Sequence, residues 1–93
     1  MNEEIRISRI VVINNPQGLH ARPADLLVKR AVQFESKIEI VKDNERVDGK
    51  SILEVLMLAA VAGTQLRFEA IGPDAEQALE ALVELVNQNF GEE

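Results

Sequence analysis

The only histidine of this chain lies in NNPQGLHARPADLLVKRA, residues 14–31, and an arginine follows two positions later. If a helix begins near Ala21, His20 lies at its N-terminus, where backbone N–H groups lack partners and the helix dipole is positive. Such a helix end binds anions. Arg22 adds a guanidinium whose donors match phosphate oxygens, and Pro23 suits a first helical turn because it has no N–H to leave unpaired. The segment therefore predicts a phosphate site around a histidine.

A neutral imidazole in such a site can attack phosphorus. We expect the positive helix end to disfavour the imidazolium form of His20 and to leave a ring nitrogen lone pair free. Once attached, a phosphoryl group of charge about −1.5 to −2 is favoured by the dipole and by Arg22. Gly18 lets the preceding backbone bend. The alternative is a histidine that only caps the helix or lies on the surface, and no Asp or Glu close in the sequence supports a hydrolytic triad.

Length and composition indicate one soluble globular domain over residues 1–93, with 46% hydrophobic and 28% charged residues. The chain has no cysteine, which excludes disulfides and thiolate chemistry, and a single histidine argues against a metal site, so we expect no metal and no cofactor. A net charge of −6 argues against nucleic acid and anionic membranes as partners. Without a signal peptide or a long apolar run, we expect a cytoplasmic monomer.

The spacing of apolar residues predicts the order strand, helix, strand, strand, helix, strand, helix. Strands are expected at 5–13, 37–42, 46–48 and 65–71, and helices from Ala21, over 51–60 and after Asp74, a natural N-cap. In 65–71 the residues Leu66, Phe68 and Ala70 should face inward, and Gln65, Arg67 and Glu69 outward. The predicted fold is a two-layer α+β domain whose mainly antiparallel sheet has helices on one face.

Three separated stretches resemble one known family. The segment GLHARPA (18–24) resembles the active-site signature of the histidine-containing phosphocarrier (HPr) family of the bacterial phosphoenolpyruvate-dependent sugar phosphotransferase system. GKSILEVLMLAA (49–60) and GPDAEQALEAL (72–82) resemble the regulatory-serine helix and the last helix of the same family. The resemblance spans nearly the whole chain in the same order.

The resemblance implies an open-faced β-sandwich (βαββαβα), with a four-stranded antiparallel sheet and three helices. In this family the histidine takes a phosphoryl group from enzyme I at Nδ1 and gives it to an enzyme IIA domain. Carried over, His20 is the phosphohistidine and Arg22 the phosphate partner, in a carrier with no turnover chemistry of its own. Sugar uptake and a regulatory nitrogen branch both use such carriers.

Ser51 has two interpretations. As a structural residue it is a good N-cap and forms a capping box with Glu54. As a regulatory residue it matches the serine that a dedicated HPr kinase/phosphorylase modifies in many family members. Glu54 departs from the family, because many members have glycine there, and its carboxylate would repel a phosphoserine.

The helix that follows Ser51 also predicts a docking surface. Its spacing favours Ile52, Val55 and either Leu58 or Ala59 packing inward, with Leu53 and Leu56 less protected. Exposed leucines near the histidine would form an apolar patch for enzyme I and enzyme IIA. The cationic residues Lys29, Lys50 and Arg30 could steer partners to this face, although Arg30 is equally consistent with a solvated helix face.

Two other classes of function compete with the carrier. One is a regulatory interaction module, acting in the nitrogen branch or through serine phosphorylation on a kinase or a transcription regulator. Family members of that kind typically lack the histidine that this chain has. The other is a phosphatase or mutase using His20 covalently, which would need a second acid or base beside the ring.

Overall fold

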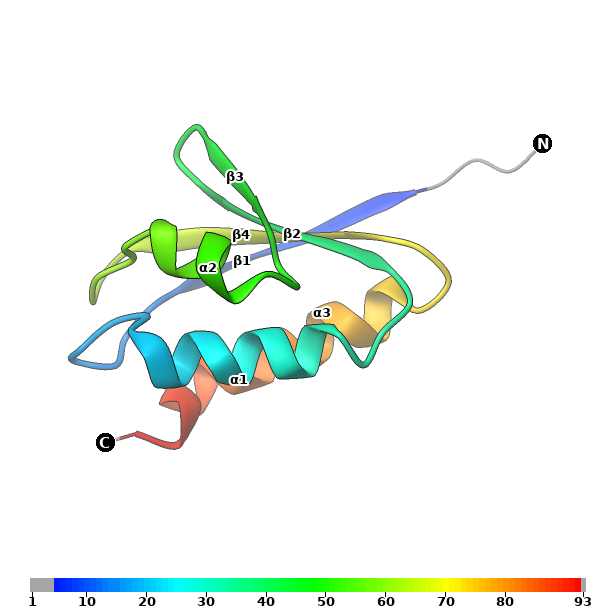
Figure 1. Ribbon diagram of the computed structural model, residues 1–93. Coiled ribbons are helices and arrows are strands. Elements are labelled where there is room, and N and C mark those ends of the chain that lie inside the picture. The colour runs from blue at the N-terminus through cyan, green and yellow to red at the C-terminus, as the bar shows by residue number, and fades with distance from the viewer. Residues whose placement is uncertain (1–4, 93) are drawn as a thin grey trace.

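The computed structural model describes residues 5–92, and its elements follow the predicted order (Figure 1). The strands are β1 (Arg6–Val12), β2 (Lys37–Lys42), β3 (Glu45–Asp48) and β4 (Gln65–Ile71), and the helices are α1 (Ala21–Ala31), α2 (Ile52–Met57) and α3 (Ala75–Asn87), followed by the short 3₁₀ turn η1 (Asn89–Gly91). The predicted strand at 65–71 and the helix start at Ala21 are confirmed.

The strands form one antiparallel sheet in the order β1-β4-β2-β3. β4 is central, with Phe68 opposite Arg9 of β1 on one side and Ile40 of β2 on the other. Helices α1 and α3 run beneath the sheet, α2 contacts α1, and among residues 5–92 no helix covers the opposite face of the sheet (Figure 1). The predicted open-faced α+β architecture is therefore confirmed.

Alternating residues of the strands and one stripe of each long helix build the core between the two layers. On β4 the side chains of Leu66, Phe68 and Ala70 are buried, as period-2 alternation predicts. The helical stripes are buried at Ala24, Leu27 and Ala31 of α1 and at Ala75, Ala78, Leu79, Leu82 and Val86 of α3. This core fixes the direction of α1 and so the position of its N-terminal end.

Glu69 departs from the expectation that outward polar residues of β4 lie in water. It points to the open face, but only 6% of it is exposed. Three arginines, Arg6, Arg46 and Arg67, bond its carboxylate from three strands and cover it. The alternation predicted the face correctly and the exposure wrongly, because long cationic side chains on neighbouring strands lie across the glutamate.

Two helix boundaries also differ in detail. Asp74 occupies the N-cap position of α3, but its carboxylate makes no capping bond and instead accepts from the backbone N–H groups of Glu35 and Ser36, 2.9 Å away in each case. Helix α2 ends at Met57, earlier than the predicted residue 60, and Ala59 has a left-handed φ of 50°. A residue with left-handed backbone angles just beyond a helix ends the helix, because the chain leaves the right-handed helical path at that residue.

Candidate functional site

The loop between β1 and α1 is pinned to the segment that follows α2. Gly18 has a φ of 70°, and a Cβ atom on it would lie 2.5 Å from the carbonyl oxygen of Ala60. The N–H of Leu19 donates to that same carbonyl at 2.8 Å, and Asn15 Nδ2 donates to the carbonyl of Gly18 at 2.7 Å. These contacts explain why a glycine is required at position 18, and they fix the position of the backbone that leads into His20 and α1.

His20 is the N-cap residue of α1, with extended backbone angles (φ −80°, ψ −167°). Its imidazole makes no capping hydrogen bond, and 34% of the side chain is exposed. The ring therefore lies at the helix end, accessible from solvent and not used in capping. The first N–H groups of a helix have no partner inside it, so this end can bind an anion beside the imidazole.

Arg22 lies on the exposed side of the first turn of α1, and its guanidinium reaches the C-terminal segment. Nη1 donates to the carbonyl of Phe90 at 2.8 Å and to Glu92 Oε2 at 3.3 Å. The side chain is 55% exposed. His20 Nε2 and Arg22 Nη1 thus both contact Glu92 Oε2, at 2.9 Å and 3.3 Å, which brings the two side chains to the same carboxylate.

Glu92 is the residue that sequence reasoning missed. Its Oε2 lies 2.9 Å from His20 Nε2, and its Oε1 accepts from Asn15 Nδ2, also at 2.9 Å. Partial burial raises the pKa of this carboxyl, but hydrogen bonds from Asn15, His20 and Arg22 outweigh burial and leave the pKa below its usual range. The expectation of a neutral ring at a positive helix end took no account of this negative charge. A contact across 72 positions leaves no signal in the local pattern.

An apolar patch lies on α2 and the segment after it, close to the histidine loop. Leu53 and Met57 are each 73% exposed and Val61 is 67% exposed, whereas Leu56 is only partly so. Val55 and Leu58 pack inward, as the helical spacing predicted, with Leu58 and not Ala59 as the third inward position. Met57 and Val61 extend the expected leucine patch.

The two lysines predicted at this face are engaged locally. Lys50 Nζ donates to the carbonyl of Phe34 at 2.7 Å, which stabilises the end of the turn after α1. Lys29 Nζ pairs with Asp25 one helical turn earlier, at 3.0 Å. Lys29 is 73% exposed at the side chain, so of the two its charge is the more accessible to a partner.

Ser51 caps α2, because its hydroxyl accepts from the N–H of Glu54 at 3.4 Å. The reciprocal bond of a capping box is absent from the described residues: Glu54 Oε1 accepts from the N–H of Asp48 at 3.0 Å instead. The cap is therefore confirmed and the box is only half formed. Ser51 is partly exposed.

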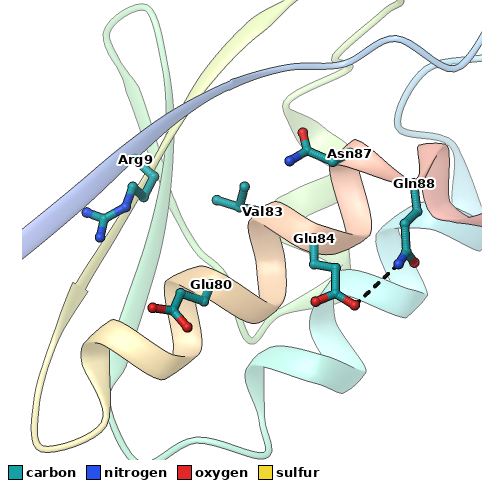
Figure 2. Close-up of a pocket in the computed structure, with 6 residues that line it drawn as sticks. All are labelled: Arg9, Glu80, Val83, Glu84, Asn87 and Gln88. Carbon is teal, nitrogen blue, oxygen red and sulfur yellow. Dashed lines mark hydrogen bonds between the residues drawn. The ribbon is translucent and has the colours of Figure 1, made fainter.

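A groove lies elsewhere, between β1 and α3 (Figure 2). Arg9 borders it from the strand, Val83 and Glu80 from the middle of the helix, and Glu84, Asn87 and Gln88 from its C-terminal part. No predicted site residue lines it. Within residues 5–92 no group of acidic residues and histidine is arranged to hold a metal ion, and no helix is long and apolar enough to cross a bilayer.

Fold and site together define a small α+β protein that presents a partly exposed histidine, with an arginine beside it, at the start of a helix. Comparison with known proteins identifies the family. The family model described as "PTS HPr component phosphorylation site" matches residues 7–88. The phosphocarrier protein HPr of Neisseria meningitidis serogroup A is 41% identical over 86 residues, which are 92% of this chain and 97% of the relative.

Two further matches agree. HPr of Treponema pallidum is 42% identical over 87 residues, covering 94% of this chain and 99% of that protein. The crystal structure of HPr-C-His from Thermoanaerobacter tengcongensis superposes with a TM-score of 0.91 at 42% identity, covering 94% of this chain and 98% of the other. The chain belongs to the HPr family of the phosphotransferase system, and it is a phosphocarrier rather than an enzyme.

Proposed function

We propose that His20 carries the phosphoryl group and that Arg22 is its phosphate partner. The observation that supports this most is the placement of the only histidine at the N-cap position of α1, partly exposed and not used in capping. The phosphocarrier takes its group from phosphorylated enzyme I and passes it to an enzyme IIA domain. An accessible ring at the surface suits two successive transfers, because each partner must reach phosphorus directly.

Incubation with phosphoenolpyruvate and enzyme I tests this assignment. We expect a base-stable, acid-labile phosphate on the wild-type protein and none on His20→Ala. Gln17→Ala, an exposed change in the same loop, is the control and should be phosphorylated normally. Phosphate retained by His20→Ala would overturn the assignment. Hydrolysis of a phosphate ester by the protein alone would instead support a covalent enzyme.

The exposed side chains of Leu53, Met57 and Val61 form the patch that we propose for docking enzyme I and enzyme IIA domains. The partly buried Leu56 lies at its border, and Lys29 adds accessible charge. Lys50 contributes less, because its ammonium group is bonded to the Phe34 carbonyl. Leu53→Glu should raise the KM of enzyme I for this protein. Ile10→Glu should not, because Ile10 is also apolar and exposed, at 63%, but lies on the open face of the sheet.

Phosphorylation of Ser51 by an HPr kinase/phosphorylase is a second, regulatory proposal. The partly exposed hydroxyl and its long 3.4 Å bond to the Glu54 N–H leave it accessible, but the Glu54 carboxylate would repel the new phosphate. Glu54→Gly should therefore be phosphorylated faster by that kinase than the wild type, and Ser51→Ala should not be phosphorylated. A protein modified only at Ser51 and never at His20 would support the regulatory interaction module acting on a kinase or a transcription regulator.

We also propose that the protein works as a monomer in the cytoplasm, where enzyme I and its substrate meet. Light scattering during size-exclusion chromatography should give a mass near 10.3 kDa. A mass of about twice that value at micromolar concentration would contradict the monomer.

A further inference from the structure

The Glu92 carboxylate reaches three groups of the histidine site at once. It accepts from His20 Nε2 at 2.9 Å, from Asn15 Nδ2 at 2.9 Å and from Arg22 Nη1 at 3.3 Å. Only 20% of its side chain is exposed, so it is held against the site and not merely near it. An acid in this position is the ring partner that the local sequence did not offer.

The backbone after α3 brings Glu92 to the site. Asn89, Phe90 and Gly91 all have positive φ values, of 53°, 55° and 74°, and this left-handed turn changes the direction of the chain after α3. The Phe90 side chain is buried in the core at 2% exposure, and its carbonyl accepts from Arg22. Phe90 therefore anchors the C-terminal segment through both its side chain and its carbonyl group, two residues before Glu92.

The direction of the hydrogen bond decides which ring nitrogen is nucleophilic. An ionised carboxylate can only accept, so His20 Nε2 must carry the hydrogen that lies between it and Oε2. In a neutral imidazole the other nitrogen, Nδ1, then has the free lone pair. We propose that Glu92 is a positioning residue for phosphoryl transfer, which holds the Nε2–H form of His20 and balances the positive charge that the ring gains when Nδ1 bonds phosphorus. This inference rests on the proposed role of His20.

The transfer step balances with the proton in place. The Nδ1 lone pair forms the new bond to phosphorus, while the bond between phosphorus and its donor atom on enzyme I breaks and its electron pair leaves with the donor. The ring then bears both a phosphoryl group and the Nε2 hydrogen, so it is positively charged until that hydrogen is lost. The carboxylate 2.9 Å from Nε2 faces this charge as it develops.

Arg22 can serve both states of the site. Its contact with Glu92 is, at 3.3 Å, the longest of the three bonds to that carboxylate. A phosphoryl group on Nδ1 offers the guanidinium a stronger acceptor. Movement of Arg22 to the phosphate would leave the bond between His20 and Glu92 intact. Arg22 can therefore bind the C-terminal segment before transfer and the phosphoryl group after it.

Three variants separate the charge of Glu92 from its hydrogen bond. Glu92→Gln keeps an acceptor oxygen without charge, and Glu92→Ala removes both. A Glu92→Ala/Glu93→Ala double variant removes the next acid in the sequence as a substitute. Glu80→Gln, an exposed acid on α3, is the control for a lost negative charge. The measurements are the single-turnover rate of phosphorylation by enzyme I and the proton signal of His20 Nε2–H in nuclear magnetic resonance spectra.

We expect a low-field Nε2–H signal in the wild type, in Glu80→Gln and in Glu92→Gln, and its loss in both alanine variants. Phosphorylation should slow about tenfold in the alanine variants and less in Glu92→Gln. If the C-terminal segment acted only by holding the structure together, Glu92→Gln would instead react at the wild-type rate. Wild-type rates in the Gln variant and the double variant would overturn the proposal. A wild-type protein that enzyme I does not phosphorylate would refute the role of His20 instead.

Discussion

In the unphosphorylated protein Arg22 donates hydrogen bonds to the C-terminal segment, namely to the Phe90 carbonyl and to Glu92. One of its acceptors is a neutral carbonyl, and the other is a carboxylate that it shares with His20 and Asn15. The guanidinium can therefore turn to a phosphoryl group at little cost in side-chain entropy. The proposed role of Arg22 as phosphate partner therefore requires both its charge and its fork of donors.

Replacing Arg22 should slow transfer without unfolding the protein. We expect Arg22→Ala to lower kcat/KM with enzyme I by roughly 10- to 100-fold, since a charged hydrogen bond to phosphate is lost. Arg22→Lys should recover part of the rate, because a lysine keeps the charge but not the fork. Arg9→Ala, at an exposed arginine on β1, is the control. Stopped-flow phosphorylation measures the rates, and an unchanged Arg22→Ala rate would remove Arg22 from the site.

Gly18 is a single position whose backbone conformation and close packing hold the loop that leads to His20. A methyl group there would meet the Ala60 carbonyl oxygen at 2.5 Å, at a φ of 70° that disfavours side chains. We expect Gly18→Ala to cost roughly 2 to 4 kcal/mol of unfolding free energy, from backbone strain and overpacking together. Gly63→Ala is a matched control, because its φ is 90° but nothing lies within 4 Å of the added carbon. It should lose only the strain component, about 1 to 2 kcal/mol. Equal losses in urea unfolding would contradict the close contact.

At the scale of elements, Asp74 joins the start of α3 to the connection between α1 and β2. Its carboxylate accepts from Ser36 Oγ and from the N–H groups of Glu35 and Ser36. The hydrogen bond from the Ser36 side chain, followed by that from the Glu35 backbone, holds the pKa of Asp74 below its usual value. Asp74 therefore links the start of α3 to the connection between α1 and β2 instead of capping its own helix, and we call these bonds the Asp74 lock.

Asp74→Asn should test this lock. The amide keeps one acceptor oxygen but places an NH₂ group against the N–H donors of the loop, so we expect Tm to fall by several degrees. Glu76→Gln, two residues further along α3, removes one charge and weakens only an exposed pair with Arg9, and it should change Tm much less. Differential scanning calorimetry compares the two. A larger loss in Glu76→Gln would show that charge, and not the lock, is responsible.

The elements themselves could be predicted because their signals are local. Alternation in β4 and the three-and-four spacing of α1 and α3 are set by which residues must face the core, and the structure follows them. The partners of Asp74 and Glu92 could not be predicted, because the two carboxylates bond residues 38 to 77 positions away. Which acceptor lies opposite a donor depends on how the layers pack, and single-sequence periodicity does not carry that information.

At the scale of the whole molecule, Glu69 connects the strands across the open face of the sheet. Arg6 of β1 donates to it at 2.9 Å and Arg67 of β4 at 2.7 Å. Arg46 of β3 bonds both Glu69 and Glu39 of β2, so that every strand contributes. In a chain of net charge −6, this network concentrates cations on the face opposite the helices. An unpaired carboxylate at 6% exposure would be costly, so the arginines are what allow it there.

The Glu69 network makes stability depend on acid pH. Hydrogen bonding from Arg46, opposed by burial and supported by Arg67, lowers the pKa of Glu69 from 4.5 to about 2. A lowered folded pKa gives stability that is complete above pH 4.5, the unfolded value, and is lost as the pH falls toward 2. We expect Glu69→Gln to lose roughly 1 to 3 kcal/mol at pH 7, a range discounted because the guanidinium groups are partly in water.

Urea unfolding of the wild type and Glu69→Gln at pH 7, 4.5, 3 and 2 measures the effect. The free energy of unfolding should differ most at pH 7, and the two proteins should converge as the pH approaches 2, since the other carboxylates titrate alike in both and cancel in the difference. Glu45→Gln, an exposed change on β3, should track the wild type at every pH. A difference between wild type and Glu69→Gln that stays constant from pH 7 to 2 would mean that the loss comes from packing and not from the charge of Glu69.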